Sequence, residues 1–428
     1  MGISFTEKQQ QVIDARGCNL LVSAAAGSGK TAVLVERIVG MVSDREHPVD
    51  IDRLLVVTFT NAAAAEMRER ISRALGSRLA ADPENEHLQR QAALLHNARI
   101  TTIDSFCLFV LRNQFHTIGL DPGFRIAEEG EGRLIRQETL EAVLEAGYAA
   151  QEENFLYCME YFSSGRRDTA VEELVLKLYD FAMSTPFPEQ WLEERKQDYC
   201  LPEGCFEEIP WVQDLLCQTR LVLTGCVEKL AEAVHICEEP DGPYMYGELL
   251  DREREMAEQI LKKCREENPG AGKQNEAGES VYDALYTAFE TIRFGRLPSK
   301  KDETVSVIKR EAVKGIRAEV KEQLGDLQKK YFFRSREQVL GQIEICWKAV
   351  GALVDLTLAF KRMFDAKKRD KNILDFDDIE HFALSILVRQ DEGGACKPTE
   401  TALEYRSHFH EILIDEYQDS NLVQEYIL

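Results

Sequence analysis

Two short stretches far apart in the chain carry residues that could bind and cleave a phosphate anhydride. The first is AAAGSGKT, residues 24–31, which lies between an apolar run and a helix-like segment. Gly27 and Gly29 let backbone N–H groups turn toward phosphate oxygens, and the following helix adds a partial positive charge. In such a loop the Lys30 ammonium reaches the β- and γ-phosphates, and the Thr31 hydroxyl binds Mg²⁺. The predicted phosphate-binding residues are Ala26, Gly27, Ser28, Gly29, Lys30 and Thr31.

The second stretch, ILIDEYQD, is an apolar strand pattern that ends in acidic residues. A phosphate loop needs such a strand end, because Mg²⁺ must be held and the attacking water must be activated. Asp415 is placed to hold Mg²⁺, and Glu416 is placed to polarise the water. Gln418 and Asp419 follow in order. Together the two stretches predict a nucleoside-triphosphate site that uses Mg²⁺, with Lys30, Asp415 and Glu416 as its catalytic residues.

Alternating strand and helix signals surround these stretches. Strands next to one another in a βαβ pattern are parallel, so the alternation predicts an α/β domain with a parallel sheet. The apolar runs are Asn19–Ser23, Leu54–Thr58, Arg99–Ile103 and Glu411–Ile414, and helical periodicity follows the first three at Thr31–Val42, Ala62–Leu75 and Ser105–Phe115.

The middle of the chain has a different pattern. Helical periodicity dominates residues 124–371, and strand signals are few. We therefore expect an α/β domain, residues 1–123 and 372–428, interrupted by a long, mainly α-helical insertion at 124–371. The chain stops inside an apolar helix-like segment, Leu422–Leu428, and we take it to be part of a longer protein.

Composition narrows the class of protein. The net charge of −23 argues against a broadly nucleic-acid-binding surface. Between Arg293 and Lys371, however, 20 Lys and Arg face 11 Asp and Glu; this stretch is either a nucleic-acid contact or a solvated helix face. The eleven cysteines form no C-x-x-C pair or zinc-finger spacing, and no run of about 18 apolar residues occurs. We expect a cytoplasmic protein with reduced thiols.

Five motifs in order make the chain resemble the UvrD/Rep-like superfamily-one DNA helicases. They are SAAAGSGKT, VVTFTNAAAAEMRERI, TTIDSFC, LDFDDI and ILIDEYQDSN. The Ala-rich loop and the long gap from Lys30 to Asp415 make it most similar to the AddA-type helicase–nucleases within that group. The resemblance rests on both ends of the chain and implies a RecA-like P-loop NTPase domain, ATP with Mg²⁺ as cofactors, single-stranded or duplex-end DNA as a ligand, and an AddB-like partner subunit.

The resemblance also implies roles for individual residues. Gln9 in FTEKQQQVI matches the glutamine that reads adenine, although Gln10 and Gln11 are neighbouring alternatives. Gln418 matches the residue that senses the γ-phosphate, so the resemblance adds it to the catalytic residues. Ala32 occupies a nucleotide-contact position where UvrD-type members carry Arg. The implied DNA-binding residues are Thr58, Phe59, Thr60, Asn61, Thr102, Ser105 and Phe106.

Several of these residues also have a purely structural interpretation. Asn61 could be the N-cap of the helix that follows TFTN. The family commonly has His where this chain has Asp104, and an acid beside a phosphodiester would repel it, so Asp104 could instead cap the next helix. In LDFDDI, Asp375, Asp377 and Asp378 could be mistaken for a metal cluster, but their spacing around a helix start favours a cap where the chain returns to the α/β domain.

The leading hypothesis is the N-terminal, ATP-binding portion of an ATP-dependent DNA helicase of the AddA helicase–nuclease type, acting in double-strand break repair and recombination, with a 3′–5′ exonuclease domain elsewhere in the full-length protein. We expect weak Mg-ATP binding and poor hydrolysis from this portion alone, because an arginine finger is worth about 10³–10⁵ in rate. The alternatives are a stand-alone UvrD/Rep-type repair helicase and a nucleotide-gated module that docks a partner.

Overall fold

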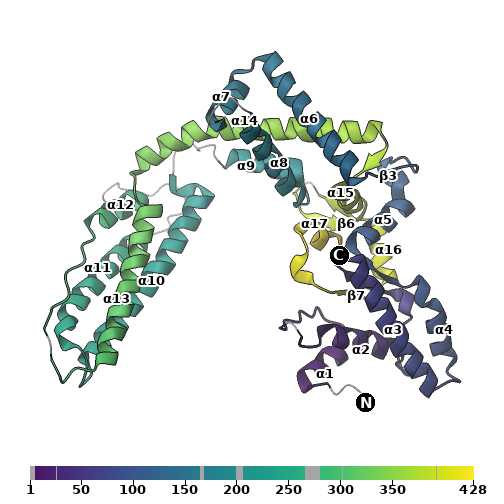
Figure 1. Cartoon of the computed structure of the whole chain (residues 1–428), viewed down its shortest axis with the longest axis horizontal. Coiled ribbons are helices and arrows are strands. Elements are labelled where there is room, and N and C mark those ends of the chain that lie inside the picture. Colours follow the sequence, from purple (N-terminus) through teal and green to yellow (C-terminus); the bar gives the residue numbers. More distant parts are fainter. Residues whose placement is uncertain are drawn as a thin grey trace. The chain divides into compact units, whose positions relative to one another are not determined.

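The chain forms two compact units, each described here by itself. The computed structural model (Figure 1) describes residues 5–25, 27–163, 168–198, 206–265, 280–300, 302–391 and 393–428. Unit 1 comprises Met1–Gln151, Asp168–Leu192 and Asp355–Leu428, and unit 2 comprises Glu152–Arg167 and Glu193–Val354. No helix in these described ranges is long and apolar enough to cross a membrane.

Unit 1 contains the strands and the helices that cover them. The strands are β1 (Leu54–Thr58), β2 (Arg99–Thr102), β3 (Arg125–Ile126), β4 (Ile373–Leu374), β5 (Val388–Gln390), β6 (Cys396–Pro398) and β7 (Glu411–Ile414). Its helices are α1 (Glu7–Asp14), α2 (Lys30–Val42), α3 (Asn61–Ala81), α4 (Glu86–Leu94), α5 (Ile103–Gln114), α6 (Glu129–Ala150), α8 (Thr169–Met183), α15 (Phe376–Leu387), α16 (Glu400–His408) and α17 (Leu422–Ile427). Helices α9 (Pro188–Gln197) and α14 (Arg336–Asp370) contribute to both units.

A parallel sheet of three strands in the order β2-β1-β7 organises unit 1, as the alternating pattern predicts. All five residues of β1 are buried, which explains their unbroken apolar run. Leu54 and Val56 belong to a core with α2, α3 and α4. Leu55 and Val57 belong to a second core with α5, α15 and α17. The alternation of side chains along β1 therefore places helices on both faces of the sheet.

The predicted strand at Asn19–Ser23 is wrong. Residues 19–25 have no regular secondary structure, and the side chains of Leu20, Leu21 and Val22 are 45%, 79% and 44% exposed. A strand exists only when its N–H and C=O groups pair with a neighbour. Within the described part of the chain, neither β7 nor any other strand pairs with this segment, so its apolar pattern alone does not make it a strand.

A two-residue parallel pairing marks where the chain leaves the sheet region and where it returns. Arg125 of β3 pairs with Ile373 of β4, and Ile126 pairs with Leu374, although about 250 residues separate them in sequence. Between these strands, every regular element that the structure describes is helical. The predicted helical character of this region is therefore confirmed.

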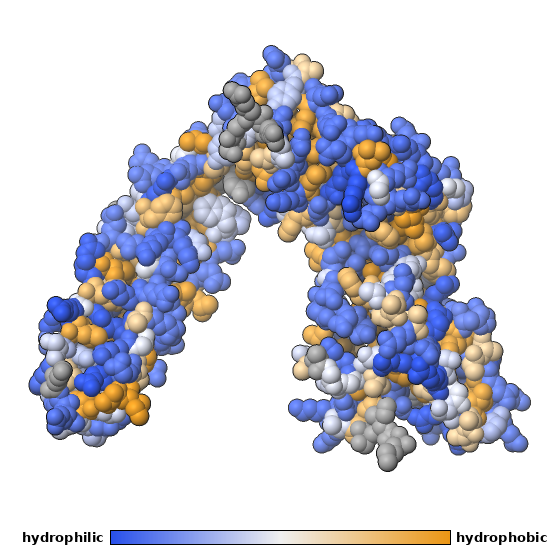
Figure 2. All heavy atoms as spheres, in the orientation of Figure 1, coloured by the Kyte–Doolittle hydropathy of each residue, from blue (hydrophilic) through white to orange (hydrophobic). Residues whose placement is uncertain are grey.

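Unit 2 is built on long helices around one apolar core. Besides parts of α9 and α14, it contains α7 (Glu153–Phe162), α10 (Pro210–Glu238), α11 (Gly247–Arg265), α12 (Val281–Thr291) and α13 (Val307–Lys330). Helices α10 to α13 lie side by side in Figure 1 and bury Phe289, Phe332 and Tyr282 among them. In Figure 2 this bundle presents mainly hydrophilic residues with scattered apolar ones.

Unit 1 also includes helices from the mainly helical middle of the chain. Helices α6 and α8 and the end of α14 belong to unit 1. There, Tyr179 of α8 packs edge-on against Phe360 of α14 with ring centroids 5.2 Å apart. Periodicity shows that a segment is helical, but it does not show which core the helix joins.

Candidate functional site

The phosphate-loop sequence forms a tight turn that opens directly into α2. Gly27 and Gly29 have φ angles of 76° and 83°, in the left-handed region that favours glycine. The Ser28 N–H donates to the Ala25 carbonyl at 3.2 Å. Gly29 is the N-cap of α2, and no side chain caps the helix, so the first N–H groups of α2 lack a side-chain acceptor. The predicted site residue Ala26 lies outside the described residues.

Of the three neighbouring glutamines, Gln9 is the one whose amide reaches this turn. Its Nε2 donates to the Ser28 carbonyl at 3.0 Å, and its Oε1 accepts from the Thr6 N–H at 2.8 Å. Gln10 instead donates to Asp14 on its own helix at 2.9 Å. The geometry favours Gln9 among the three candidates for a position beside the loop.

Helix α2 is fixed to the sheet by a buried ion pair. Arg37 is only 6% exposed, and its Nε donates to the Glu411 carboxylate at 2.6 Å. Its Nη1 donates to the Val12 carbonyl at 2.6 Å. One guanidinium thus joins α1, α2 and β7, and it places the loop beside the strand that carries the acidic residues.

The acidic residues follow β7 at the carboxyl end of the sheet. The Asp415 N–H donates to the Val57 carbonyl at 2.9 Å, which continues the pairing with β1. Burial and the neighbouring Glu416 charge raise the pKa of Asp415, while the Lys30 ammonium opposes that rise. Lys30 and Asp415, 385 positions apart, therefore share one electrostatic environment. Glu416 is exposed with a φ of 58°, and the Gln418 amide donates to its carboxylate.

The TFTN segment places its residues in two different environments. Thr58 is buried, and its hydroxyl donates to the Thr60 carbonyl at 3.1 Å. Phe59 is 60% exposed, and Asn61 is exposed at the start of α3. Thr60, not Asn61, caps this helix, because its hydroxyl accepts from the Ala63 N–H at 3.1 Å. The proposed cap at Asn61 is wrong by one residue, and the Asn61 side chain is left to face solvent.

The TTIDSFC segment packs partly into the core of unit 1. Thr102 is the N-cap of α5 and accepts from the Ser105 N–H at 3.3 Å, so capping by Asp104 is wrong. Phe106 is only 4% exposed and packs against Tyr405 and Phe409 with ring centroids 6.1 and 6.2 Å apart. The Phe106 side chain belongs to the core that α5 shares with α15 and α16, so it is almost closed to solvent in this structure.

The structure shows one residue beside these motifs that the sequence pattern missed. Glu380 of α15 is buried, and its carboxylate accepts hydrogen bonds from the Asn421 and Gln424 side chains at 3.1 and 2.6 Å. Burial and the Glu380 charge raise the pKa of Asp104 to about 6. The residue lies five positions after the α15 cap in an ordinary amphipathic helix, so no spacing signal pointed to it.

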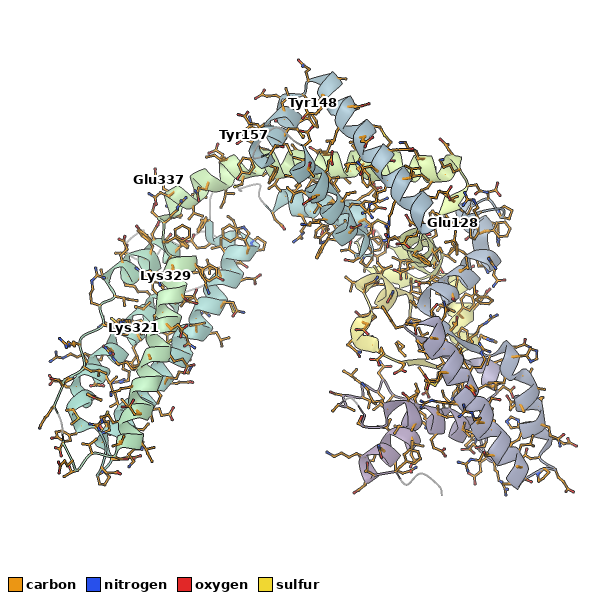
Figure 3. All side chains as sticks on the ribbon, viewed as in Figure 1. Glu128, Tyr148, Tyr157, Lys321, Lys329 and Glu337 are labelled. Atoms are coloured by element: carbon orange, nitrogen blue, oxygen red, sulfur yellow. The ribbon has the colours of Figure 1, made fainter. Side chains whose placement is uncertain are left out.

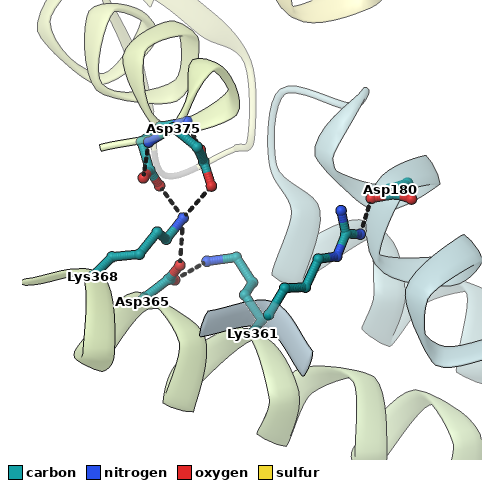
Figure 4. Close-up of polar contacts among 7 residues, drawn as sticks. Asp180, Lys361, Asp365, Lys368 and Asp375 are labelled. Carbon is teal, nitrogen blue, oxygen red and sulfur yellow. Dashed lines mark hydrogen bonds and ion pairs between the residues drawn. The ribbon is translucent and has the colours of Figure 1, made fainter. Parts of the chain in front are cut away.

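The three aspartates of LDFDDI include the predicted helix cap. Asp375 is the N-cap of α15, and it forms a reciprocal capping box with Asp378 through N–H···O bonds of 2.8 and 3.0 Å. The buried Lys368 ammonium donates to Asp375 at 2.8 Å and to Asp378 at 2.7 Å (Figure 4). The prediction that this motif caps a helix where the chain returns is confirmed.

The positive stretch 293–371 is partly neutralised by acidic partners, many of them from outside it. Lys309 pairs with Glu239 and Asp241, Arg317 with Glu253 at 2.6 Å, and Arg336 with Asp283 at 3.1 Å. Lys321 and Lys329 both project from α13 (Figure 3). Because Lys309, Arg317 and Arg336 are already paired, less positive charge is available for a nucleic-acid phosphate than the count of basic residues suggests.

Comparison with known proteins defines the class. The UvrD/REP helicase N-terminal domain family matches residues 5–428, so the chain belongs to this family. It is 46% identical over 426 residues to an ATP-dependent helicase/nuclease subunit of Lachnoclostridium phytofermentans, covering 99% of this chain and 30% of that protein. It is 41% identical over 425 residues to the protein of the same name from Acetivibrio thermocellus, covering 99% of this chain and 33% of that protein.

A third relative of the same name, from Thermoanaerobacter pseudethanolicus, is 42% identical over 433 residues and is covered to 34% of its length. The chain thus spans about a third of the curated relatives it matches. The resemblance to the helicase family, and within it to the AddA-type helicase–nucleases, is confirmed.

Proposed function

We propose that the chain is the N-terminal, ATP-binding part of an ATP-dependent DNA helicase of the helicase–nuclease (AddA) type. The observation that carries this proposal is the convergence of Gln9, the Gly27–Thr31 turn and Asp415 at one end of a parallel sheet. Ligands bind at the carboxyl ends of parallel strands, where loops and helix N-termini meet. In this proposal the domain is RecA-like, with residues 1–123 and 372–428 forming the nucleotide domain and residues 124–371 the insertion.

The uncapped start of α2 supports phosphate binding, since its free N–H groups and helix dipole attract anions. Lys30 would meet the β- and γ-phosphates, and Ser28 and Ala32 would line the loop. Thr31 and Asp415 would hold Mg²⁺, which takes one or two protein oxygens together with phosphates and waters. The chemistry of Asp415 fits a cation, because its carboxylate is partly desolvated and lies beside a second acid. The ion would supply charge neutralisation at the phosphates.

Glu416 and Gln418 would serve the attacking water and the γ-phosphate. Their side chains are exposed and bonded to each other, so both can reorient when a nucleotide binds. DNA would contact the exposed residues of the first motif, Phe59, Thr60 and Asn61, and the partly exposed Ser105. Thr58 and Thr102 are buried, and they would hold Thr60 and Ser105 in place through their hydrogen bonds to these residues.

In the full-length protein we propose DNA unwinding and end processing in double-strand break repair and recombination. The relatives are named as subunits of an ATP-dependent helicase/nuclease. That name supports a nuclease activity outside this chain and a partner protein, of the AddB type, in the same complex.

The Mg-ATP affinity of a Lys30→Ala variant tests this proposal. The variant is expected to lose Mg-ATP affinity at least tenfold, because it removes the cation that the loop would present to the phosphates; a charged hydrogen bond is worth about 1.5–3 kcal/mol. Fluorescent-nucleotide titration measures the affinity, and the exposed Lys371→Ala is the matched control. Equal affinity in Lys30→Ala and the unmodified chain would refute the proposed phosphate site.

A second prediction separates the adjacent glutamines. Gln9→Ala is expected to weaken ATP binding about tenfold, since one hydrogen bond contributes about 1 kcal/mol and this amide also anchors the loop through Ser28. Gln10→Ala should leave ATP affinity unchanged, because its amide is bonded to Asp14. Competition between ATP and GTP measures base preference. Equal losses in the two variants would remove Gln9 from the adenine site.

A further inference from the structure

One buried carboxylate in unit 1 holds both side chains of a helix cap. Glu380 of α15 is only 6% exposed. Its Oε2 accepts from Asn421 Nδ2 at 3.1 Å, and its Oε1 accepts from Gln424 Nε2 at 2.6 Å. Asn421 is the N-cap of α17, and Gln424 is the third residue of that helix. A single side chain of α15 thus holds the first turn of α17.

The two cap residues also bond to each other, and these bonds fix the direction of their amides. The Gln424 N–H donates to Asn421 Oδ1 at 2.8 Å, and the Asn421 N–H donates to Gln424 Oε1 at 3.4 Å. Since both amide oxygens serve this capping box, the NH₂ groups are the parts that face Glu380. A side chain that meets both NH₂ groups must offer two acceptor oxygens, which a carboxylate has and a neutral amide lacks.

Helix α17 directly follows the acidic segment, residues 415–420, and the two ends of this segment are held separately. At its start the Asp415 N–H donates to the Val57 carbonyl at 2.9 Å, which continues the sheet. At its other end the chain enters the capped start of α17. The Tyr417 hydroxyl adds a bond to Glu425 of the same helix at 3.0 Å. The path of the acidic segment therefore depends on where α17 lies.

The middle of the acidic segment needs support from both ends. Glu416 and Gln418 are exposed there. Glu416 has a φ of 58°, in the left-handed region that is unfavourable for a residue with a side chain. Such a conformation persists only where the surrounding structure enforces it. The sheet enforces it on one side of Glu416, and the cap that Glu380 holds enforces it on the other.

We propose that Glu380 is a positioning residue for ATP hydrolysis, which holds Glu416 and Gln418 in place through the start of α17. This inference rests on the proposed function, in which these two side chains serve the attacking water and the γ-phosphate. Nucleotide binding should not depend on Glu380. The Gln9 amide holds the phosphate loop, and the sheet holds Asp415.

Glu380→Gln in the full-length protein tests this role. Its kcat for ATP hydrolysis is expected to fall roughly 10- to 100-fold, because the new amide turns an N–H toward a cap NH₂ and the segment shifts. The KM for ATP should stay unchanged. Fluorescent-nucleotide titration counts the binding sites, and rates are expressed per site so that unfolded protein does not contribute. The exposed Glu404→Gln on α16 is the matched control and should keep the unmodified kcat.

Two results of this experiment would overturn the proposal. One is a kcat per site in Glu380→Gln equal to that of Glu404→Gln. The other is a loss of nucleotide-binding sites that accounts for the whole loss of rate, because a residue that only stabilises the fold would give that result.

Exchanging the two side chains provides a rescue. Gln424→Glu alone places a second carboxylate against Glu380 and should also lower kcat. In Glu380→Gln/Gln424→Glu the new amide N–H donates to the new carboxylate, and its oxygen still accepts from Asn421 Nδ2. The double variant should recover kcat to within about threefold of the unmodified protein, since neighbouring changes of this kind are not additive. A double variant as slow as the product of the two single losses would overturn the role of these hydrogen bonds.

Lys30→Ala keeps this inference separate from the proposed function. If Lys30→Ala hydrolyses ATP at the unmodified rate, the proposed function fails, and the role of Glu380 fails with it. If Lys30→Ala is inactive while Glu380→Gln keeps its kcat, only the inference about Glu380 is defeated.

Discussion

Lys368→Met is expected to lower the free energy of unfolding by about 3–5 kcal/mol, the range for breaking a buried ion pair from one side. Lys368 is 3% exposed, and its ammonium contacts Asp375, Asp378 and, at 3.6 Å, Asp365. Methionine preserves the length of the aliphatic stem, so the loss comes mainly from leaving buried carboxylates without a cation. The α15 cap depends on two of these carboxylates.

The pH dependence of this effect has a definite sign. Burial disfavours the Lys368 charge, but Asp378 and Asp375 outweigh that cost and raise its pKa above 10.5. Its stabilising contribution is complete below about pH 10.5 and is lost as the pH rises through the higher folded-state value. Burial also opposes the charge of Asp375, yet Lys368 lowers its pKa, so the contribution of Asp375 is lost as the pH falls below 3.8.

Urea unfolding from pH 3 to pH 9 therefore measures the prediction. The difference between Lys368→Met and the unmodified chain should be greatest near neutral pH and should shrink below about pH 4. The exposed Lys371→Met is the matched control, expected within about 0.5 kcal/mol of the unmodified chain. A neutral-pH loss as small as that of the control would show that the buried ammonium contributes nothing to unit 1.

The parts of the fold that could be predicted from the sequence are those that depend only on residues close together in the chain. Leu54–Thr58 is a strand with the predicted bounds because four consecutive apolar residues and a β-branched threonine suit a strand buried on both faces. Asn19–Ser23 has a similar apolar pattern and is not a strand, because pairing is a property of two segments. The Asp375 cap was predictable for the opposite reason: capping depends on residues three positions apart.

The candidate site likewise contains features that depend on neighbouring residues and features that depend on residues far away in the sequence. The tight turn at Gly27 and Gly29 was predictable because it is encoded in eight consecutive residues. The buried state of Phe106 was not, since Tyr405 and Phe409, about 300 positions later, cover its ring. Glu380 was missed for the same reason: its partners Asn421 and Gln424 are more than 40 positions away.

Two phenylalanines that resemblance places in the same role are expected to behave oppositely when truncated. Phe106→Ala should lower the free energy of unfolding by about 3–5 kcal/mol, because it empties a core site between α5 and α16. Phe59→Ala should change stability by less than about 0.5 kcal/mol, since its side chain is 60% exposed. Thermal or urea unfolding of the two variants separates them directly.

Single-stranded DNA affinity should give the reverse order. Stacking of a base on an aromatic ring is worth about 1–3 kcal/mol, so Phe59→Ala is expected to weaken binding roughly 5- to 150-fold. Phe59→Trp should restore it, because the larger ring keeps a stacking face. For Phe106, a milder Phe106→Leu change keeps the core filled and should leave DNA affinity unaltered. If Phe106→Leu lost affinity while Phe59→Ala kept it, α5 would have to open on DNA binding, and the core position of Phe106 would describe only the DNA-free state.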